Sequence, residues 1–519
     1  MAFPCKLPTT CERYLVVRVG ISGSMEAEYH YRLELSRASR QAAAIAYRSY
    51  YLPKLSYPLP VTTFTTTQLH RIESPSIQVI LAKLGYNRHF PSKVVYGPIW
   101  WGGLGIQSLA FLQGYHRLKL LLRVLNNDTK VTSLLITLLR HTAMEAGTNT
   151  IFIGTRYHII RVTQYMTHTW VTSLLRFLAE HAIHTRLHTG NFMAPLQRDG
   201  DEYLMDLFLN RRPNYALREL RSINRVRIYL QVYSKACVTN RITGKLNVNL
   251  LTRRHSWMVR RSTFIWPLSE PRPYDWTVWA AALREAFDTL VDNDTPGRWR
   301  CTHQQWSMWH QPPPAPTTLW THATNWKATV MAQDELINSS SLHDTLHRQV
   351  HGPDLRGYIR YRLGWTEDQF DAVNWVVLHR VLAATPLHIR TTTTKAMYGW
   401  LHTSHWQERI YGTTPICAMC NDIEDNDHIL QCPAQVTSRV SAREKFINEL
   451  REFGSPLPVC QVFNDRLATL LSIPPVSTLG QFDHDLTYHL SILTRQAALE
   501  QESLGWDNFL RGRQSLQWE

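Results

Sequence analysis

The amino-acid sequence predicts a mainly α-helical protein, organised as several helical domains with a small metal-binding module and little β-structure. Apolar residues recur at the three- and four-residue spacing of amphipathic helices along much of the chain. Prolines and glycines interrupt these stretches often enough to separate short helices by loops. Near the carboxyl end, three cysteines and one histidine occur close together, which is typical of a metal-braced module.

The expected helices follow the apolar pattern and its interruptions. Pro53 is expected to end the first helix and Pro75 the second, because proline lacks an N–H and clashes with the preceding turn. Gly85 is expected to end the third, since glycine favours the left-handed turn after a helix. The expected ranges are Glu28–Tyr51, Gln68–Ile72, Ser76–Leu84, Ser108–Leu125, Val131–Ala146, Val162–Ile183, Glu367–Leu382, Lys395–His402, Val440–Phe453 and Asp483–Gln501.

Two basic segments are candidates for contact with nucleic acid. In Leu204–Arg227 an apolar helical stripe is flanked by arginines at i, i+3 and i+7. In Leu251–Tyr274 the arginines surround two tryptophans. The cationic residues of these segments are Arg211, Arg212, Arg218, Arg221, Arg225, Arg227, Arg253, Arg254, Arg260 and Arg261.

Composition favours an intracellular protein with a polyanionic partner. The net charge of +15 suits RNA or DNA, although such a surplus can also serve solubility alone. Eight cysteines in 519 residues are too sparse for a disulfide framework, and no signal peptide or membrane-spanning apolar run is recognisable. The expected location is the nucleus or the cytoplasm, with no membrane partner.

The pattern Cys417-x2-Cys420-x7-His428-x3-Cys432 predicts a structural zinc site. A tight turn can present the first two thiolates together, and a helical turn can present the histidine and the last cysteine. Four protein ligands leave no position for water or substrate, so the site is expected to be structural. The intervening acidic residues repel phosphate, so the module is expected to brace the fold. Flanking groups that could contact phosphate are Arg390, Lys395 and Arg409.

No catalytic motif is recognisable in the chain. It lacks the H-x-E and H-E-x-x-H patterns of zinc enzymes and the glycine-rich phosphate-binding loop. It also contains no adjacent Asp-Asp pair of the kind that two-metal polymerases use. Catalysis by this chain alone is therefore not expected.

Strings in three parts of the chain carry a family resemblance. The strings are Tyr47–Pro53, Leu55–Pro60, Leu84–Arg88, Tyr96–Pro98, Gly102–Gly105, Gln113–Gly114, Ile223–Leu230 and Gly399–Pro433. In this order they resemble the region after the palm of non-LTR retrotransposon reverse transcriptases, through to the CCHC zinc motif near their carboxyl end. The chain lacks the family's Tyr-x-Asp-Asp motif, so it is expected to be a truncated element or part of a longer reading frame.

The resemblance implies a thumb-and-connector scaffold that binds RNA or DNA, with Arg88 among its contacts. Two alternatives stay open: the chain completes a separate reverse transcriptase palm in trans, or it is a zinc-braced helical scaffold for another protein. Trp276 and Trp279 are expected to pack in a core. The expected divisions are 1–130 (thumb-like), 131–310 (basic connector), 311–316 (proline-rich linker), 317–415 (helical), 416–433 (zinc module) and 434–519 (carboxyl-terminal helices).

Overall fold

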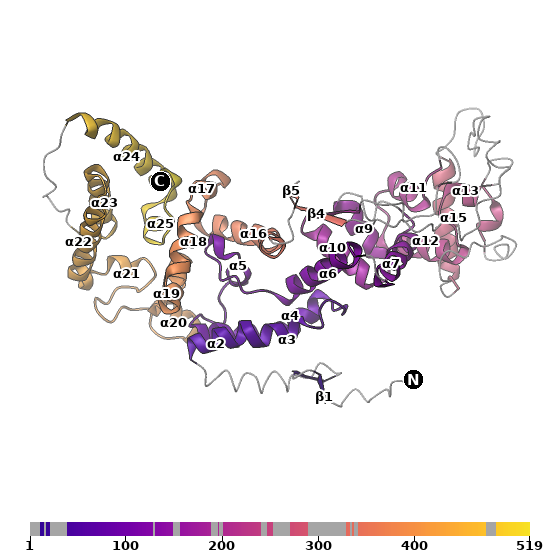
Figure 1. Ribbon diagram of the computed structural model, residues 1–519, viewed down its shortest axis with the longest axis horizontal. Coiled ribbons are helices and arrows are strands. Elements are labelled where there is room, and N and C mark those ends of the chain that lie inside the picture. The colour runs from indigo at the N-terminus through magenta and orange to yellow at the C-terminus, as the bar shows by residue number, and fades with distance from the viewer. Residues whose placement is uncertain are drawn as a thin grey trace. The chain divides into compact units, whose positions relative to one another are not determined.

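The described part of the chain is mainly helical, as predicted (Figure 1). It divides into two compact units, each built from separated segments. Unit 1 comprises Met1–Leu55, Thr67–Leu109 and Val350–Glu519, and unit 2 comprises Ser56–Thr66 and Ala110–Gln349. The computed structural model describes residues 11–14, 17–20, 39–127, 130–148, 156–187, 196, 201–239, 246–252, 270–288, 328–332, 335–336, 341–473 and 484–518.

The units are discontinuous, whereas the division expected from the sequence ran in order along the chain. Residues 67–109 group with residues 350–519, which follow them by more than two hundred positions. The expected proline-rich linker, 311–316, lies outside the described residues.

Within the described residues, unit 1 is a helical assembly with one small hairpin. Two strands, β1 (Cys11–Tyr14) and β2 (Val17–Gly20), pair antiparallel. The helices are α2 (Arg40–Ala46), α3 (Leu52–Ser56), α4 (Thr66–Leu84), α5 (Ser92–Tyr96), α16 (Leu342–Leu363), α17 (Glu367–Asp371), α18 (Trp375–Ala384), α19 (Leu387–Met397), α20 (Ser404–Tyr411), α21 (His428–Gln431), α22 (Val436–Glu452), α23 (Leu457–Leu470), α24 (His484–Leu504) and α25 (Trp506–Leu510), with 3-10 turns at Ile99–Trp101, Pro433–Gln435 and Leu516–Trp518.

Pro53 and Pro75 do not end helices, so both predictions were wrong. A π-helical turn, Tyr47–Tyr51, connects α2 to α3, which contains Pro53. The wider π turn relaxes the backbone pairing just before a residue that cannot donate an N–H. Pro75 lies inside α4, where the neighbouring Ser76 hydroxyl donates to the Glu73 carbonyl at 2.7 Å.

The core of unit 1 joins residues that are far apart in the sequence. Leu81 and Val94 are buried in the same cluster as Ile359, Leu378 and Met397. Helix α18 begins after Asn374, whose side chain accepts from Val377 N–H, and α19 begins after Pro386. Burial of apolar side chains from both segments is what makes the discontinuous unit compact.

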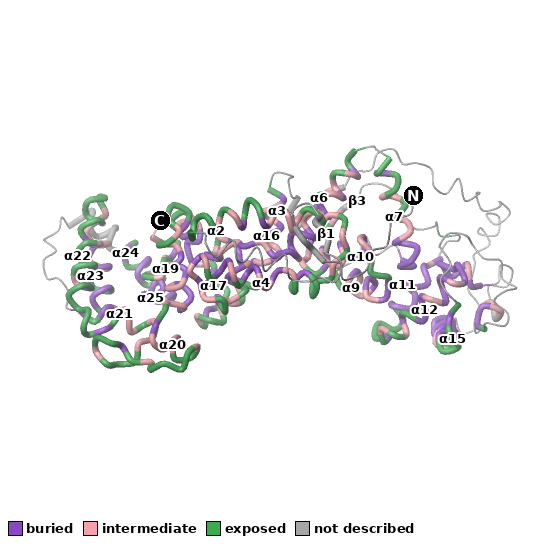
Figure 2. Tube along the Cα trace, turned by 90° about the horizontal axis from the view of Figure 1, so that it is seen from below, coloured by how far each residue is buried: buried purple, intermediate pink, exposed green. Residues whose placement is uncertain are grey.

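The carboxyl-terminal helices pack on a second, smaller core around Phe463 and Trp506. Arg513, itself 1% exposed, fastens the last turn to the main core by donating to the Met397 carbonyl at 2.7 Å and to Asn508 Oδ1 at 2.8 Å. The long helix α22 remains largely exposed (Figure 2).

Unit 2 is also helical, with a three-stranded antiparallel sheet in the order β3–β4–β5. The expected helix Val162–Ile183 is two helices, because the Thr169 hydroxyl caps a new start by accepting from Thr172 N–H. Its elements are α6 (Leu109–Leu125), α7 (Lys130–Ala146), α9 (Arg156–Tyr165), α10 (Trp170–Glu180), β3 (Ile183–Leu187), α11 (Leu204–Arg211), α12 (Leu217–Leu230), α13 (Lys235–Val238), a 3-10 turn (Val248–Leu250), α15 (Pro273–Asp288), β4 (Ala328–Ala332) and β5 (Glu335–Leu336).

Trp276 and Trp279 are both buried, which confirms the prediction that they pack in a core. The indole N–H of Trp279 donates to the Leu250 carbonyl at 2.9 Å, so the ring buries no unsatisfied donor. Among the described helices, none combines the length and the apolar character that a bilayer crossing requires.

Candidate metal centre

The first two cysteines lie on a tight turn closed by backbone hydrogen bonds. Cys417 N–H donates to the Asp422 carbonyl at 2.7 Å, and Ile416 forms an antiparallel bridge with Ile423. Asn421 closes the turn in the left-handed region, at a φ of 64°, which asparagine tolerates better than most residues. The turn therefore presents Cys417 and Cys420 from one short loop.

The second pair of residues comes from the short helix α21. Asp425 Oδ1 accepts the N–H groups of Asp427 at 3.0 Å and of His428 at 2.7 Å, so its carboxylate holds the start of the helix. His428 is the first residue of α21, and Cys432 follows directly after its last. One helical turn thus separates the imidazole from the thiol, as the spacing predicted.

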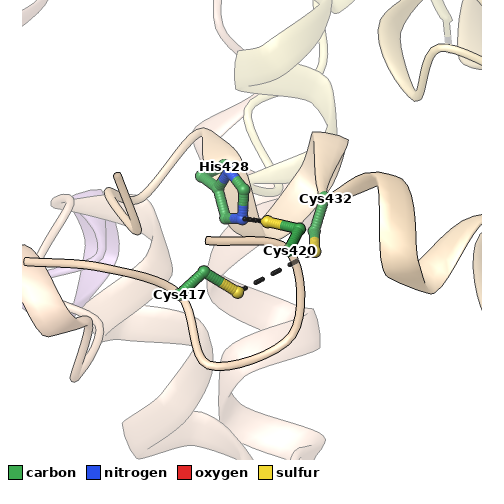
Figure 3. A group of neighbouring side chains, drawn as sticks. All are labelled: Cys417, Cys420, His428 and Cys432. Atoms are coloured by element: carbon green, nitrogen blue, oxygen red, sulfur yellow. Dashed lines mark hydrogen bonds between the residues drawn. The ribbon is translucent and has the colours of Figure 1, made fainter. Parts of the chain in front are cut away.

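The four side chains converge on one point (Figure 3). Cys417 Sγ lies 4.0 Å from Cys432 Sγ, and Cys420 Sγ lies 3.2 Å from His428 Nε2. All four ligand atoms lie within 4.8 Å of one another. Tetrahedral coordination with metal–sulfur bonds of about 2.3 Å places neighbouring ligands about 3.7 Å apart. The predicted set is therefore assembled at a separation that a single metal ion can bridge.

Neighbouring backbone groups favour the thiolate form of Cys417, which is the form that binds a metal. The backbone N–H groups of Met419 and Cys420 are directed at Cys417 Sγ and lower its pKa to about 7. Burial acts in the opposite direction on Cys420 and raises the pKa of its thiol. A cation placed among the four atoms would favour thiolates at every position. With all four positions supplied by protein, the arrangement suits a structural role.

The acidic loop between the ligands binds the rest of unit 1. Glu424 Oε2 accepts Ser404 N–H at 3.0 Å, at the start of α20. Asn426 donates to the Gly399 carbonyl at 2.9 Å, and Asp427 pairs with Arg511 at 2.8 Å. These carboxylates and the amide therefore connect the loop between the four clustered side chains to α20 and to the segment after α25.

The cations that flank the cluster differ in their surroundings. Arg409 is exposed, with its guanidinium 5.2 Å from the centre of the Trp406 ring. Arg390 Nη2 donates to the Thr385 carbonyl at 3.0 Å. Lys395 is partly buried, and burial and then the charge of Arg40 lower its pKa. Arg88 is exposed beyond the end of α4.

Several predicted arginines of unit 2 contact other groups of the protein. Arg225 forms a 2.8 Å ion pair with the buried Asp275. Arg212 lies 3.9 Å from Glu219 and 3.8 Å from Glu285. Arg218 stacks on Tyr274, and Arg221 donates to the Gln164 carbonyl at 3.2 Å. Arg211 and Arg218 are exposed and have no hydrogen bond or ion pair with the described part of the chain, although Arg218 stacks on Tyr274.

Arg227 does not belong to the cationic surface, so that prediction was wrong. Its side chain is fully buried. It donates to the carbonyls of Met144 at 2.8 Å and Glu145 at 2.6 Å, and to Asn224 Oδ1 at 2.9 Å. It is a structural residue of unit 2, because the folded chain supplies all its partners.

Four predicted residues, Arg253, Arg254, Arg260 and Arg261, lie outside the described residues. Sequence reasoning missed the anchoring roles of Glu424 and Asn426. The available signal was the density of Asp and Asn in residues 421–428, since these side chains favour caps and turns.

No protein-family model matches the chain, and no curated protein matches it.

Proposed function

We propose that this protein binds nucleic acid through a cationic helical surface and that a structural zinc ion braces it. One observation carries the proposal: in Ser39–Leu55 and Thr67–Leu109 of unit 1, the only acidic residue is Glu73, and it is buried. The exposed cations of the same segments are Arg40, Arg48, Arg71, Arg88 and Lys93.

Such a surface favours a polyanion for a simple electrostatic reason. Surface cations near carboxylates are partly neutralised, whereas cations without them keep their field. Each one that contacts a phosphate releases a condensed counterion, and the gain is largest at low salt. Burial also raises the pKa of Glu73 to about 7, which reduces its negative charge near neutral pH. These segments thus offer phosphate contacts with little competing negative charge.

Zinc is the metal that best suits the cluster of Cys417, Cys420, His428 and Cys432. Three thiols and an imidazole are ligands that zinc binds in tetrahedral structural sites. Binding would contribute folding free energy on the order of 10 kcal/mol in a small module. Through the contacts of Glu424, Asn426 and Asp427, the folded module would also hold α20 and the segment after α25 in place.

The proposed role is that of the thumb-and-connector part of a reverse transcriptase of the non-LTR type, without its own palm. The residue strings described above support this relation, and the absence of a Tyr-x-Asp-Asp motif limits the role to binding. The chain would contribute to DNA synthesis if it completed a palm supplied by a separate polypeptide. Primer extension by a palm-containing partner, with and without this chain, measures that contribution.

The direct test of nucleic-acid binding is fluorescence anisotropy with a labelled 16-base-pair RNA duplex, the DNA duplex of the same sequence and each single strand. We expect the affinity to fall steeply between about 50 and 200 mM salt, because phosphate contacts release counterions. Undetectable binding at the lowest salt, or an affinity independent of salt, would contradict the proposal.

A further inference from the structure

Three cations from two helices gather beside the turn that ends α4. We infer that Arg40, Arg390 and Lys395 form a phosphate-binding site around Gly85 and Tyr86. The inference deepens the proposed function and rests on it for the source of the phosphate, which would be the nucleic-acid backbone.

In the turn after α4, Arg40 lies against the backbone of Gly85, which has no side chain. Gly85 N–H bonds to the Ala82 carbonyl and Tyr86 N–H to the Leu81 carbonyl, a pairing that requires a left-handed residue at position 85. A Cβ atom at Gly85 would lie 2.7 Å from Arg40 Nη2. The guanidinium of Arg40, in the first turn of α2, therefore lies directly over the glycine.

Helix α19 brings the other two cations to the same turn. The Thr391 hydroxyl donates to the Leu84 carbonyl at 3.2 Å, which fixes α19 against the end of α4. Lys395 follows Thr391 by one helical turn and so lies on the same face. Arg390 donates to the Thr385 carbonyl and lies close enough to Tyr86 for its charge, like that of Arg40, to lower the pKa of that phenol against the larger opposing effect of burial.

Arg40 and Lys395 have no hydrogen bond or ion pair with any residue that the structure describes. They are nevertheless close enough for the charge of Arg40 to lower the pKa of Lys395, in addition to the effect of burial. Neither α2 nor α19 contains an acidic residue. Two like charges held together without a carboxylate cost free energy that an anion would offset.

Capping of α4 explains the three cations less well than a bound anion does. A cation near the end of a helix can stabilise its free carbonyls. Here the Leu84 carbonyl is taken by Thr391, and Arg40 donates to none of the others. A phosphate group matches the arrangement, since it can accept from a guanidinium and an ammonium at the same time.

The test is the salt dependence of duplex binding in the full chain. We expect Arg40→Ala with Lys395→Ala to lower the slope of log Kd against log salt by about two. The matched control is Lys445→Ala with Arg466→Ala, which removes two cations of unit 1 that are paired with Glu449 and Glu502. It should leave the slope unchanged, and Arg40→Lys with Lys395→Arg should retain the wild-type slope.

A second measurement separates the site from the function. Inorganic phosphate, compared with chloride at equal ionic strength, should slow amine labelling of Lys395 but not of Lys445. Such protection without duplex binding would keep the site, assign it to small phosphate ligands and overturn the proposed function. Duplex binding with equal slopes in the double variant and its control would overturn the site and leave the function standing.

Discussion

Two arginines of α12 in unit 2 and two arginines of unit 1 have opposite surroundings. On α12 of unit 2, Arg225 is paired with Asp275 and Arg227 is buried under backbone carbonyls. In unit 1, Arg48 and Arg88 are exposed and have no ion pair with a described residue. A run of arginines thus indicates a cationic surface only where the guanidinium groups are not already paired with carboxylates or carbonyls of the protein.

Substitutions in the zinc module should have the largest effect, and they test how far the local fold of unit 1 depends on the four clustered side chains. Cys417→Ser or His428→Ala should abolish stoichiometric zinc and increase hydrogen exchange over residues 416–433, because metal binding provides much of the local folding free energy. Metal analysis of the purified protein measures the first and exchange mass spectrometry the second. Cys460→Ser, at a buried cysteine outside the cluster, should retain the metal. Unchanged zinc in both ligand variants would remove the assignment.

Arg227→Ala should strongly destabilise unit 2, by roughly 3–5 kcal/mol, since it leaves several buried carbonyls without a donor. Chemical denaturation, monitored by hydrogen exchange in α12, measures the loss of stability. Arg218→Ala, on the exposed face of the same helix, is the control and should cost less than about 1 kcal/mol. Equal effects of the two substitutions would contradict the distinction between structural and surface arginines.

Glu73 should make the stability of unit 1 fall as the pH rises. Burial raises its pKa from 4.5 to about 7, against opposing hydrogen bonds from Leu109 and Tyr96. The folded state therefore holds the proton more tightly. The contribution of protonated Glu73 to the free energy of unfolding is complete below pH 4.5. It declines above pH 4.5 and is lost as the pH passes about 7. Its size is on the order of 3 kcal/mol.

Thermal unfolding of Glu73→Gln between pH 5 and 8 checks this expectation. The substitution should remove most of the pH dependence, because the amide is neutral throughout. Glu444→Gln, at an exposed position of α22, should preserve the wild-type profile. The expectation fails if both variants follow the same pH profile as the wild type.

Local patterns predicted the helical class and the grouping of Cys417, Cys420, His428 and Cys432, because both depend on spacing along a short stretch of chain. Packing between distant segments was not predictable in this way. No local pattern shows that Thr391 contacts Leu84, or that residues 67–109 belong with residues 350–519. The π turn that lets a helix continue through Pro53 is likewise set by the surrounding fold.

Arg227 is an instructive case, because a signal was present. It lies four positions after Ile223 and three before Leu230, both buried, and so on the apolar stripe of α12. A charged residue within an apolar stripe indicates a buried group with its own acceptors. The ion pair of Arg225 had no such signal, since Asp275 lies fifty residues away.

The salt dependence of RNA duplex binding, measured on matched double variants, tests the central claim most directly. Arg48→Ala with Arg88→Ala removes two exposed cations of unit 1, and Arg212→Ala with Arg225→Ala removes two paired ones of unit 2. We expect the slope of log Kd against log salt to fall by about two in the first and to change little in the second. A larger fall in the second, or no salt dependence in the wild type, would contradict the account.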